Sequence, residues 1–546
     1  MTELKPAAVA PAGGSRASSM VAGGILLSRI SGLVRERVFA QFFGTSLYAD
    51  VFRAGLRMPN MLQNLLGEGT LSASFIPVYA ELLEQGREEE AGKVAGAIFA
   101  LLLAVAGALA LVGVLLAEPL VSFLLPGFTG ERRALTVAVS RILFPMTGIL
   151  VLSAWSLGIL NSHRRFFIPY FAPVLWNGAM ITTLLAFGGR FDPVRLVVAL
   201  AWGALIGGAL QFLIQLPWVL SLERNLRLSW GKGLAPVREA VKNAGPAILG
   251  RGVVQLSGWL DMVLASLLAV GAVAAIGYAQ TIYVLPVSLF GMSIAAAELP
   301  ELSRRRAGGM DILRERTQAA LRRVAFFVVP TFVAFVLLGD VWVAALYQTG
   351  EFGADDTRLV YLTLAGYALG LIASTSTRLF SSAFFALRDT RTPARIAAVR
   401  VVTSALVAFV LMTQFEPVRV FGYTFGPGFG ADLRIGTRTL GAVGLALGSG
   451  AGAWLEWALL RRELNKRIGA VGAGAAIMTR MLVASIAGAA AGWGTRLLIG
   501  SVHPVLDAAL IGGAFGVVYV GLGVALGIEQ ASVFANRIRR LAGRRS

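Results

Sequence analysis

The sequence predicts an all-α integral membrane protein with about fourteen transmembrane helices. Of its 546 residues, 56% are hydrophobic and only 14% are charged, and the mean hydropathy is +0.72. Soluble domains typically carry about 25% charged residues, so composition alone indicates a membrane protein. Apolar blocks of spanning length recur along the chain, and none has the strict alternation of a transmembrane β-barrel.

The predicted spans are apolar blocks, except for a charged pair near the start of the chain. The apolar blocks are 94–116, 138–160, 171–187, 196–220, 248–270, 324–346, 362–385, 396–412, 440–460, 477–499 and 506–526. The charged pair covers 28–77, and its short connection at 44–48 predicts a helical hairpin. A further span is expected at 272–299.

The distribution of basic residues predicts the orientation in the membrane. The formal net charge is +19, which by itself could suggest nucleic-acid binding. Counted from a cytoplasmic N-terminus, however, roughly thirty Lys and Arg fall in the tails and alternate connections, against about six in the opposite set. This positive-inside bias predicts a multi-pass plasma-membrane protein with both termini in the cytoplasm, contacting membrane lipids and no nucleic acid.

Several chemical classes are excluded by what the sequence lacks. There is no cysteine, so disulfides, thiolate metal sites and thiol nucleophiles are absent. The two histidines, His163 and His503, are expected to be solvated residues of connections, and no metal site is predicted. No phosphate-binding G-x-x-x-x-G-K-[ST] motif occurs, and no cofactor is predicted. An enzyme is the least expected class, because no acid–base or nucleophile set is assembled.

A weak internal repeat predicts two halves. The segments 43–59 and 271–286 are alike in Gly, Pro and Ala/Tyr content, and 161–169 resembles 385–393, at an offset of about 225 residues. Such repeats are typical of alternating-access transporters, although Gly and Pro also coincide by chance in helical proteins. The expected domains are a disordered tail (1–18), an N-lobe of six spans (19–222), a C-lobe of six spans (236–468), two extra spans (475–530) and a basic cytoplasmic tail (531–546).

A polar stripe of membrane length follows the second span. If 50–68 is helical, six polar residues lie on one face at steps of three or four: Asp50, Arg53, Arg57, Asn60, Asn64 and Glu68. At 1.5 Å per residue the stripe is roughly 27 Å long, close to the thickness of the hydrocarbon core. The preceding span adds Arg29, Arg35 and Glu36.

Two explanations of this stripe are open. Four arginines facing lipid would cost around 10 kcal/mol, comparable with the stability of a domain. The charges therefore form internal ion pairs, for example Arg57 with Asp50 or Glu68, or they line a water-filled cavity that holds an anion. Guanidinium groups suit bidentate phosphate contacts, and the excess of Arg over nearby carboxylates favours the cavity.

Helix-breaking residues and the polar residues of the second half complete the candidate site. Gly32, Pro59, Gly67 and Pro286 are candidate hinges, since such breaks are tolerated where freed backbone groups meet protein or water. The second half offers Arg251, Gln280, Thr281 and Arg378. Arg251 and Arg378 lie near cytoplasmic ends of their spans, where snorkelling to the interface is an equally simple explanation.

A long motif covers the charged spans, and shorter motifs follow it. The first reads Ser28-Arg29-Ile-Ser-Gly32-Leu-Val-Arg35-Glu36, Phe43-Gly44, Ala49-Asp50, Arg57-Met-Pro59-Asn60, Gly67-Glu68-Gly69-Thr-Leu-Ser72 and Phe75-Ile-Pro77. Later motifs include Leu160-Asn161, Ala172-Pro173, Gly245-Pro246, Leu299-Pro300 and Asp389-Thr390-Arg391-Thr392-Pro393. In order and spacing they resemble the MurJ/MviN family of lipid II flippases, part of the superfamily of multidrug and oligosaccharidyl-lipid exporters.

This resemblance implies a bacterial inner-membrane protein with two lobes around a central cationic cavity and a polyprenyl-tail groove near the last two helices. The implied substrate is lipid II, an undecaprenyl-pyrophosphate-linked glycopeptide, moved from the inner to the outer leaflet. By motif position the implied first-lobe set is Arg29, Arg35, Glu36, Asp50, Arg57, Asn60 and Glu68, and Arg378 matches a basic position of span ten. Coupling to the membrane potential or a monovalent cation is left open, as is contact with cell-wall synthesis machinery.

The chain departs from the family pattern at several positions. Gln63 stands where the family often has Arg, and Gln280, Thr281 and Val284 replace a common Asp, Arg and Glu of span eight. Arg251 is a candidate substitute for the missing Arg. The open alternatives are a flippase for another polyprenyl-linked glycan, an ion-coupled drug antiporter and a non-transporting envelope scaffold. The Arg-rich first half opposes the antiporter, which should have an acidic cavity.

Overall fold

The computed structural model of the chain describes residues 15–295, 298, 310–420, 422–430, 432–500 and 503–542. The predicted disordered tail therefore lies mostly outside the described residues, as does the end of the predicted basic tail. The chain divides into two compact units, 1–263 and 264–546, each of which is considered by itself.

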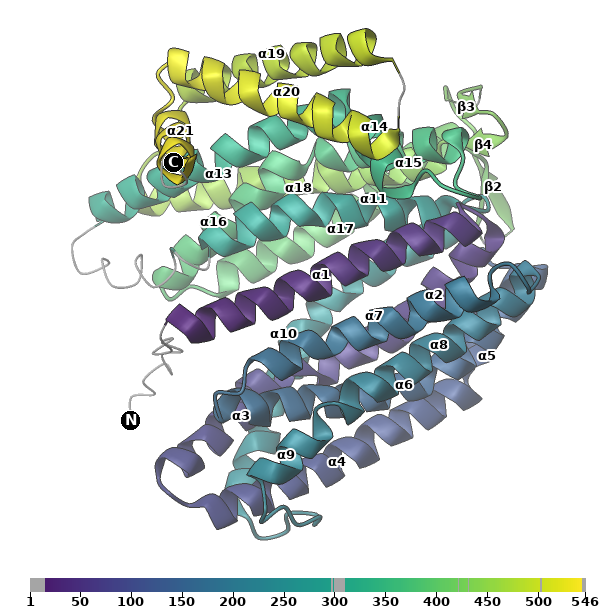
Figure 1. Cartoon of the computed structure of the whole chain (residues 1–546), viewed down its shortest axis with the longest axis vertical. Helices are drawn as coiled ribbons and strands as arrows, with labels where there is room; N and C mark the ends of the chain where they lie inside the picture. Colours follow the sequence, from purple (N-terminus) through teal and green to yellow (C-terminus); the bar gives the residue numbers. More distant parts are fainter. Residues whose placement is uncertain are drawn as a thin grey trace. The chain divides into compact units, whose positions relative to one another are not determined.

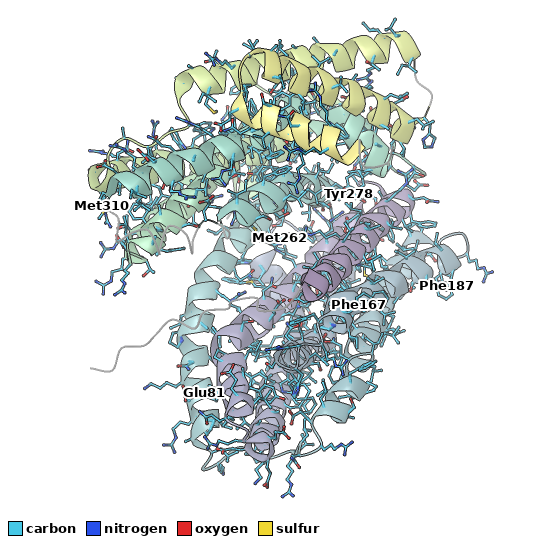
Figure 2. The ribbon with its side chains drawn as sticks, turned by 60° about the vertical axis from the view of Figure 1, so that its left-hand side comes forward. Glu81, Phe167, Phe187, Met262, Tyr278 and Met310 are labelled. Carbon is cyan, nitrogen blue, oxygen red and sulfur yellow. The ribbon has the colours of Figure 1, made fainter. Side chains whose placement is uncertain are left out.

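Unit 1 is a bundle of α-helices (Figure 1). Its helices are α1 (Ser15–Phe43), α2 (Leu47–Leu66), α3 (Glu68–Glu84), α4 (Glu88–Leu115), α5 (Ala117–Leu124), α6 (Gly130–Ser162), α7 (Phe167–Phe187), α8 (Pro193–Leu213), α9 (Leu216–Leu222) and α10 (Ala235–Ser266). The long helix α6 is central, with α2, α4 and α8 packed along it, while α1 packs along α7. Figure 2 shows Phe167 and Phe187 at the two ends of α7.

Glycine sets two features of α2. A Cβ on Gly55 would lie 2.8 Å from Cγ1 of Val139, so glycine permits the close approach of α2 to α6. At the other end, Gly67 separates α2 from α3, and its N–H donates to the carbonyl of Gln63 (2.7 Å). A Cβ on Gly67 would lie 2.5 Å from that carbonyl oxygen. The second span is therefore two helices, and the predicted stripe does not follow one continuous helix to Glu68.

Unit 2 is also helical, with short strands at one connection (Figure 1). It contains α11 (Ala272–Pro286), the π-helix η1 (Val287–Met292), α13 (Met310–Leu337), α14 (Gly339–Tyr347), α15 (Ala354–Ala368), α16 (Leu371–Ala386), α17 (Arg391–Phe415), α18 (Gly441–Ile468), α19 (Ala475–Ile499), α20 (Pro504–Ala525) and α21 (Glu529–Ala542). Between α17 and α18, β1 (Val418–Val420) pairs with β2 (Tyr423–Phe425) and β3 (Arg434–Ile435) with β4 (Arg438–Thr439), both antiparallel.

Close helix packing in unit 2 also depends on small residues. Helix α18 packs along α17, and a Cβ on its Gly448 would lie 2.3 Å from Cα of Ala408. Small residues let backbones approach in this way in membrane proteins, where van der Waals packing drives helix association. Helices α19 and α20 pack along each other, α19 against α13 and α20 against α14.

The predicted fold class is confirmed. Ten helices of the described chain are long and apolar enough to cross a membrane, or eleven if the bent pair α15 and α16 forms one span. The remaining three of the about fourteen predicted spans correspond to α1, the pair α2 and α3, and α10. Helices α1, α2 and α3 were expected from the charged pair 28–77, whereas α10 corresponds to the predicted apolar block 248–270.

The turn between α16 and α17 predicts a specific pH dependence. Asp389 accepts hydrogen bonds from Oγ1 of Thr392 (2.6 Å) and from the N–H groups of Thr392 (3.0 Å) and Arg391 (2.9 Å), and pairs with Arg467 (2.6 Å). The Thr392 hydrogen bonds, aided by Arg467, hold the pKa of Asp389 well below its usual range. A carboxyl group whose pKa is lower in the folded than in the unfolded protein stabilises the fold. This stabilisation is fully present above the unfolded-state pKa of about 3.9 and is lost as the pH falls toward and through the pKa of the folded state.

We therefore expect the stability difference between the wild type and Asp389→Asn to be constant from about pH 7 to about pH 5, and to shrink below about pH 4. Thermal unfolding of both proteins across this range measures it. A difference that already shrinks between about pH 7 and about pH 5 would contradict the assignment.

Candidate functional site

Three of the predicted residues form one buried ion cluster in unit 1. Glu36 of α1 is buried, and its two carboxylate oxygens accept from Nη2 of Arg35 (2.7 Å) and Nη2 of Arg53 (2.6 Å). Arg35 also donates through Nη1 to Oδ1 of Asn177 on α7 (3.0 Å). The cluster therefore ties α1, α2 and α7 together through charge-assisted hydrogen bonds, which are stronger than neutral ones.

Aromatic rings flank both guanidinium groups of this cluster. The ring centroid of Trp176 lies 5.0 Å from Cζ of Arg35, and that of Phe39 lies 5.2 Å from Cζ of Arg53. Both distances suit cation–π attraction. Trp176 was not singled out from the sequence, and Asn177 was noted only as part of a motif that follows Ala172-Pro173. An Asn inside the apolar block 171–187 is itself a signal, because intramembrane polar groups need partners.

Asp50 of the predicted stripe forms a buried ion pair with a residue outside the stripe. Asp50 is fully buried, and its Oδ2 accepts from Nη2 of Arg132 on α6 (2.8 Å). The guanidinium of Arg132 lies 3.7 Å from the ring centroid of Phe128. The suggested pairing of Asp50 with Arg57 is therefore wrong, and Asp50 fastens α2 to α6. Arg132 was missed because it lies ahead of the predicted block 138–160.

The other predicted first-half residues are accessible. Arg29, Arg57, Asn64 and Glu68 are exposed and Asn60 is partly exposed. Within the described part of the chain, no salt bridge joins Arg29, Arg57 or Glu68 to another residue. Arg57 reaches α10, where a Cβ on Gly258 would lie 2.2 Å from its Nη2. Unit 1 thus separates its charges into a buried paired set and an exposed set.

A polar chamber adjoins the exposed set. A cavity of about 400 Å³ is lined by Gln63, Asn64, Glu68, Gly69, Ser72 and Arg251. The guanidinium of Arg251 lies over Gly69. A Cβ added to Gly69 would lie only 1.6 Å from Cζ of Arg251. The chamber therefore combines one cation, one carboxylate, two amides and a hydroxyl, which is the chemistry that recognises a phosphorylated or glycosylated group.

In unit 2, Gln280 lines a smaller cavity of about 130 Å³, with Tyr283, Tyr367, Arg400 and Ser449 among its neighbours. Gln280 donates to the hydroxyl of Tyr367 (3.1 Å), and Arg400 pairs with Glu456 (2.8 Å). Sequence reasoning missed Arg400, which lies inside the predicted block 396–412 and so was detectable as an intramembrane cation.

The remaining second-half residues are not brought to this cavity. Thr281 donates to the carbonyl of Gly277 in its own helix (2.9 Å), and Arg378 is exposed on α16. Neither is among the residues lining the cavity.

The candidate hinges differ in their local structure. Helix α1 runs through Gly32 and α2 runs through Pro59, whose carbonyl accepts from Oγ1 of Thr147 (3.2 Å). Gly67 separates two helices, and Pro286 ends α11 where the π-helix η1 begins. Short π-helical segments are frequent at functional sites. A hinge function for these four positions stays a prediction.

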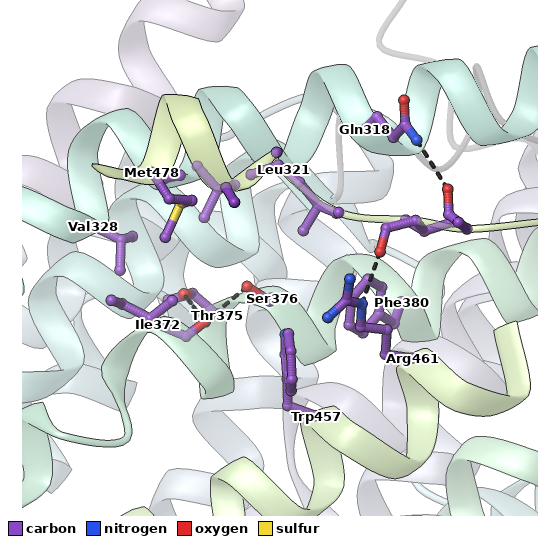
Figure 3. A pocket seen from close by; sticks show the side chains of 18 residues that line it. Gln318, Leu321, Val328, Ile372, Thr375, Ser376, Phe380, Trp457, Arg461 and Met478 are labelled. Atoms are coloured by element: carbon purple, nitrogen blue, oxygen red, sulfur yellow. Dashed lines mark hydrogen bonds between the residues drawn. The ribbon is translucent and has the colours of Figure 1, made fainter. Parts of the chain in front are cut away.

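A third cavity, of about 420 Å³, lies among α13, α16, α18 and the segment that leads into α19 (Figure 3). Apolar side chains such as Leu321, Val328 and Met478 line much of it. At its other end Arg461 donates from Nε to the carbonyl of Val471 (2.9 Å), and its Cζ lies 5.0 Å from the ring centroid of Trp457. The cavity thus has an apolar part and a cationic end.

The fold matches those of solved membrane transporters. A solved structure described as "Lipid II flippase MurJ, inward closed conformation" matches with a TM-score of 0.72 and 20% identity over 95% of this chain and 99% of that chain. An inward-facing multidrug resistance MATE family transporter of the MOP superfamily matches with a TM-score of 0.63 and 19% identity over 83% of this chain and 98% of that one. The chain therefore has the fold of the MOP-superfamily membrane transporters.

Sequence comparison gives the family. The family model described as lipid II flippase MurJ matches residues 39–504. The lipid II flippase MurJ of Burkholderia cenocepacia is 32% identical over 467 residues, covering 83% of this chain and 84% of that protein. The probable lipid II flippase MurJ of Rhizobium tropici is 32% identical over 401 residues, covering 72% of this chain and 74% of that protein. The chain belongs to the MurJ lipid II flippase family, a family of transporters of the inner membrane.

Proposed function

We propose that this protein flips lipid II from the inner to the outer leaflet of the plasma membrane by alternating access. The observation that supports this most strongly is the pair of exposed arginines, Arg29 and Arg57, in the same unit as the polar chamber that contains Arg251. Membership of the family supplies the substrate class. Guanidinium groups make strong bidentate hydrogen bonds to phosphate, so the pyrophosphate is the group they would bind.

The buried and exposed charges then have different tasks. The Glu36 cluster and the pair of Asp50 with Arg132 hold α1, α2, α6 and α7 in register, so that the exposed arginines project from rigid helices. The amides of Gln63 and Asn64 in the chamber suit the hydroxyl and amide groups of a glycopeptide head. In this proposal the predicted lobes, 19–222 and 236–468, rock about the head group while the tail stays in lipid.

The spans at 475–530 are proposed to accommodate the polyprenyl tail. The cavity shown in Figure 3 supports this, because it is largely apolar and includes Met478 of α19. The basic connections and the basic helix α21 support a cytoplasmic location of both termini, by the positive-inside rule.

The experiment that tests the function is exposure of lipid II on the outer leaflet of cells depleted of their own flippase. Expression of this protein should restore exposure and growth. If exposure is not restored by protein that reaches the membrane, the proposal fails.

Transport of another polyprenyl-linked glycan is the second candidate, favoured by Gln280 and Thr281 in place of a charged pair. Identifying the lipid-linked precursor that accumulates on depletion distinguishes the two substrates. Accumulation of a different precursor would replace lipid II in the proposal.

The contact of Arg251 with Gly69 predicts a mutant effect. Gly69→Ala should displace the guanidinium from the chamber, because the added Cβ would overlap it. We expect transport to fall by roughly tenfold, the loss of about 1.4 kcal/mol of binding energy. The matched control is Gly250→Ala, next to Arg251 on α10, where no atom lies within 4 Å of an added Cβ. Equal transport by both variants at equal membrane levels would remove Arg251 from the site.

A further inference from the structure

The connection between α17 and α18 contains an amphipathic β-hairpin. In the antiparallel pair of β1 and β2, Val418 lies opposite Phe425 and Val420 opposite Tyr423. Arg419 lies opposite Thr424. Side chains alternate along a strand, and residues opposite each other share a face. Val418, Val420, Tyr423 and Phe425 therefore form an apolar face, and Arg419 and Thr424 form a polar face.

The hairpin is fixed to the end of the membrane-spanning helix α17. The N–H of Gly428 donates to the carbonyl of Gln414 (3.1 Å), and the N–H of Gly430 donates to the same carbonyl (3.0 Å). Nearby, the buried carboxylate of Glu416 accepts from the N–H of Ala269 (2.7 Å) and from the hydroxyl of Thr439. These contacts set the position of the hairpin relative to the helix end.

The apolar side of this segment is only partly covered. The ring of Phe425 contacts that of Phe409 on α17 edge-on, with centroids 5.4 Å apart, yet Phe425 is 43% exposed. Tyr423 is 74% exposed, and Phe429, after the hairpin, is 79% exposed. The ring of Phe429 contacts that of Phe415 on α17, with centroids 6.0 Å apart. A two-stranded hairpin is marginally stable in water, and exposed aromatic side chains concentrated in one short segment mark an interaction surface.

The apolar surface of α17 leads directly to this patch. Val402, Leu406 and Val410 are exposed at steps of four residues on a helix that is apolar enough to cross the membrane. Phe409, which contacts Phe425, is next to Val410 in the same helix. Tyrosine and other aromatic side chains are enriched where a membrane protein leaves the hydrocarbon core and enters the headgroup region.

We propose that the aromatic patch of Tyr423, Phe425 and Phe429 inserts into the headgroup region of the bilayer, so that its partner is the lipid surface. The patch lies at the end of α17 opposite to its basic start, which under the proposed orientation is the outer leaflet. It sets the depth of the α17 and α18 pair in the membrane. This inference does not depend on which lipid-linked substrate is transported.

The chain contains no cysteine, which allows a direct test with single-cysteine variants. Tyr423→Cys and Phe429→Cys are labelled with a nitroxide in the full-length protein, reconstituted in vesicles of phosphatidylethanolamine and phosphatidylglycerol. The matched control is Thr424→Cys, the neighbour of Tyr423 on the polar face of the same strand. Collision rates with oxygen, which concentrates in lipid, and with a water-soluble nickel chelate report the depth of each label.

Labels at 423 and 429 are expected to collide preferentially with oxygen, and the label at 424 with the nickel chelate. Access of nickel to 423 and 429 equal to that at 424 would place the patch in water and overturn the proposal. Protection of 423 and 429 from both reagents would also overturn it, because protein would then cover the patch. The two labelled positions belong to different segments, so one supports the test if the other variant fails to fold.

Discussion

Replacing Arg29 and Arg57 together should abolish transport without unfolding the protein. Arg29→Ala and Arg57→Ala are each expected to lower lipid II exposure on the outer leaflet by roughly ten- to a hundredfold, since a hydrogen bond to a charged group contributes about 1.5–3 kcal/mol. The double variant should fail to support growth of flippase-depleted cells. Because both side chains are exposed, the amount of protein in the membrane should not change.

The matched control is Arg195→Ala. Arg195 is also exposed, and its salt bridge to Asp192 spans only three residues at the start of α8. Surface pairs of this kind contribute about 0–1 kcal/mol, so this variant should transport normally. Normal growth of the Arg29 and Arg57 double variant would exclude these arginines from substrate binding and would favour a non-transporting role.

Removing the carboxylate of Glu36 should lower the stability of the fold, in contrast to the arginine variants, which should remain folded. In Glu36→Ala the guanidinium groups of Arg35 and Arg53 would lie near each other without the carboxylate that now binds both. Breaking a buried ion pair in this way typically costs about 3–5 kcal/mol. The variant should therefore melt at a lower temperature in detergent and reach the membrane in smaller amounts.

Glu118→Ala is the control for this experiment, because Glu118 and Arg133 also form a salt bridge, at 3.4 Å, but are both exposed. Its loss should change stability by about 0–1 kcal/mol. If Glu36→Ala proves as stable as Glu118→Ala, the Glu36 cluster has no structural role. Arg35→Ala is expected to affect both stability and transport, because Arg35 belongs to this cluster and to the family motif.

The fold was predictable because the length and apolar composition of each helix can be read from a continuous segment of the sequence. Membrane-spanning helices are identified by their length and apolar composition. The break between α2 and α3 was expected because Gly67 interrupts the second predicted span. Helix α1 was expected as part of the charged pair 28–77 and α10 as the apolar block 248–270, although neither is among the spans that length and apolar composition identify in the described chain.

The pairing of charges was less predictable, since it depends on which helices touch. Helical periodicity placed Asp50 and Arg57 on one face, yet Asp50 is bound by Arg132, about eighty residues further along the chain. His163, expected to be a solvated residue, instead contacts Tyr79 (2.8 Å) and Glu223 (3.2 Å). No local pattern encodes such partners, because they are set by the approach of segments that are distant in sequence.

The central claim is that the exposed residues of the second span, Arg57, Asn64 and Glu68, face water inside the membrane rather than lipid. The decisive measurement is the reaction of a single cysteine, Asn64→Cys, with a charged, membrane-impermeant thiol reagent in reconstituted protein. Asn64 lines the polar chamber, whereas Leu111 of α4 is an exposed apolar residue of a spanning helix, so Leu111→Cys is the comparison. We predict that the cysteine at 64 reacts readily and that the one at 111 does not. A cysteine at 64 as inert as the one at 111, in protein that is folded, would contradict the account.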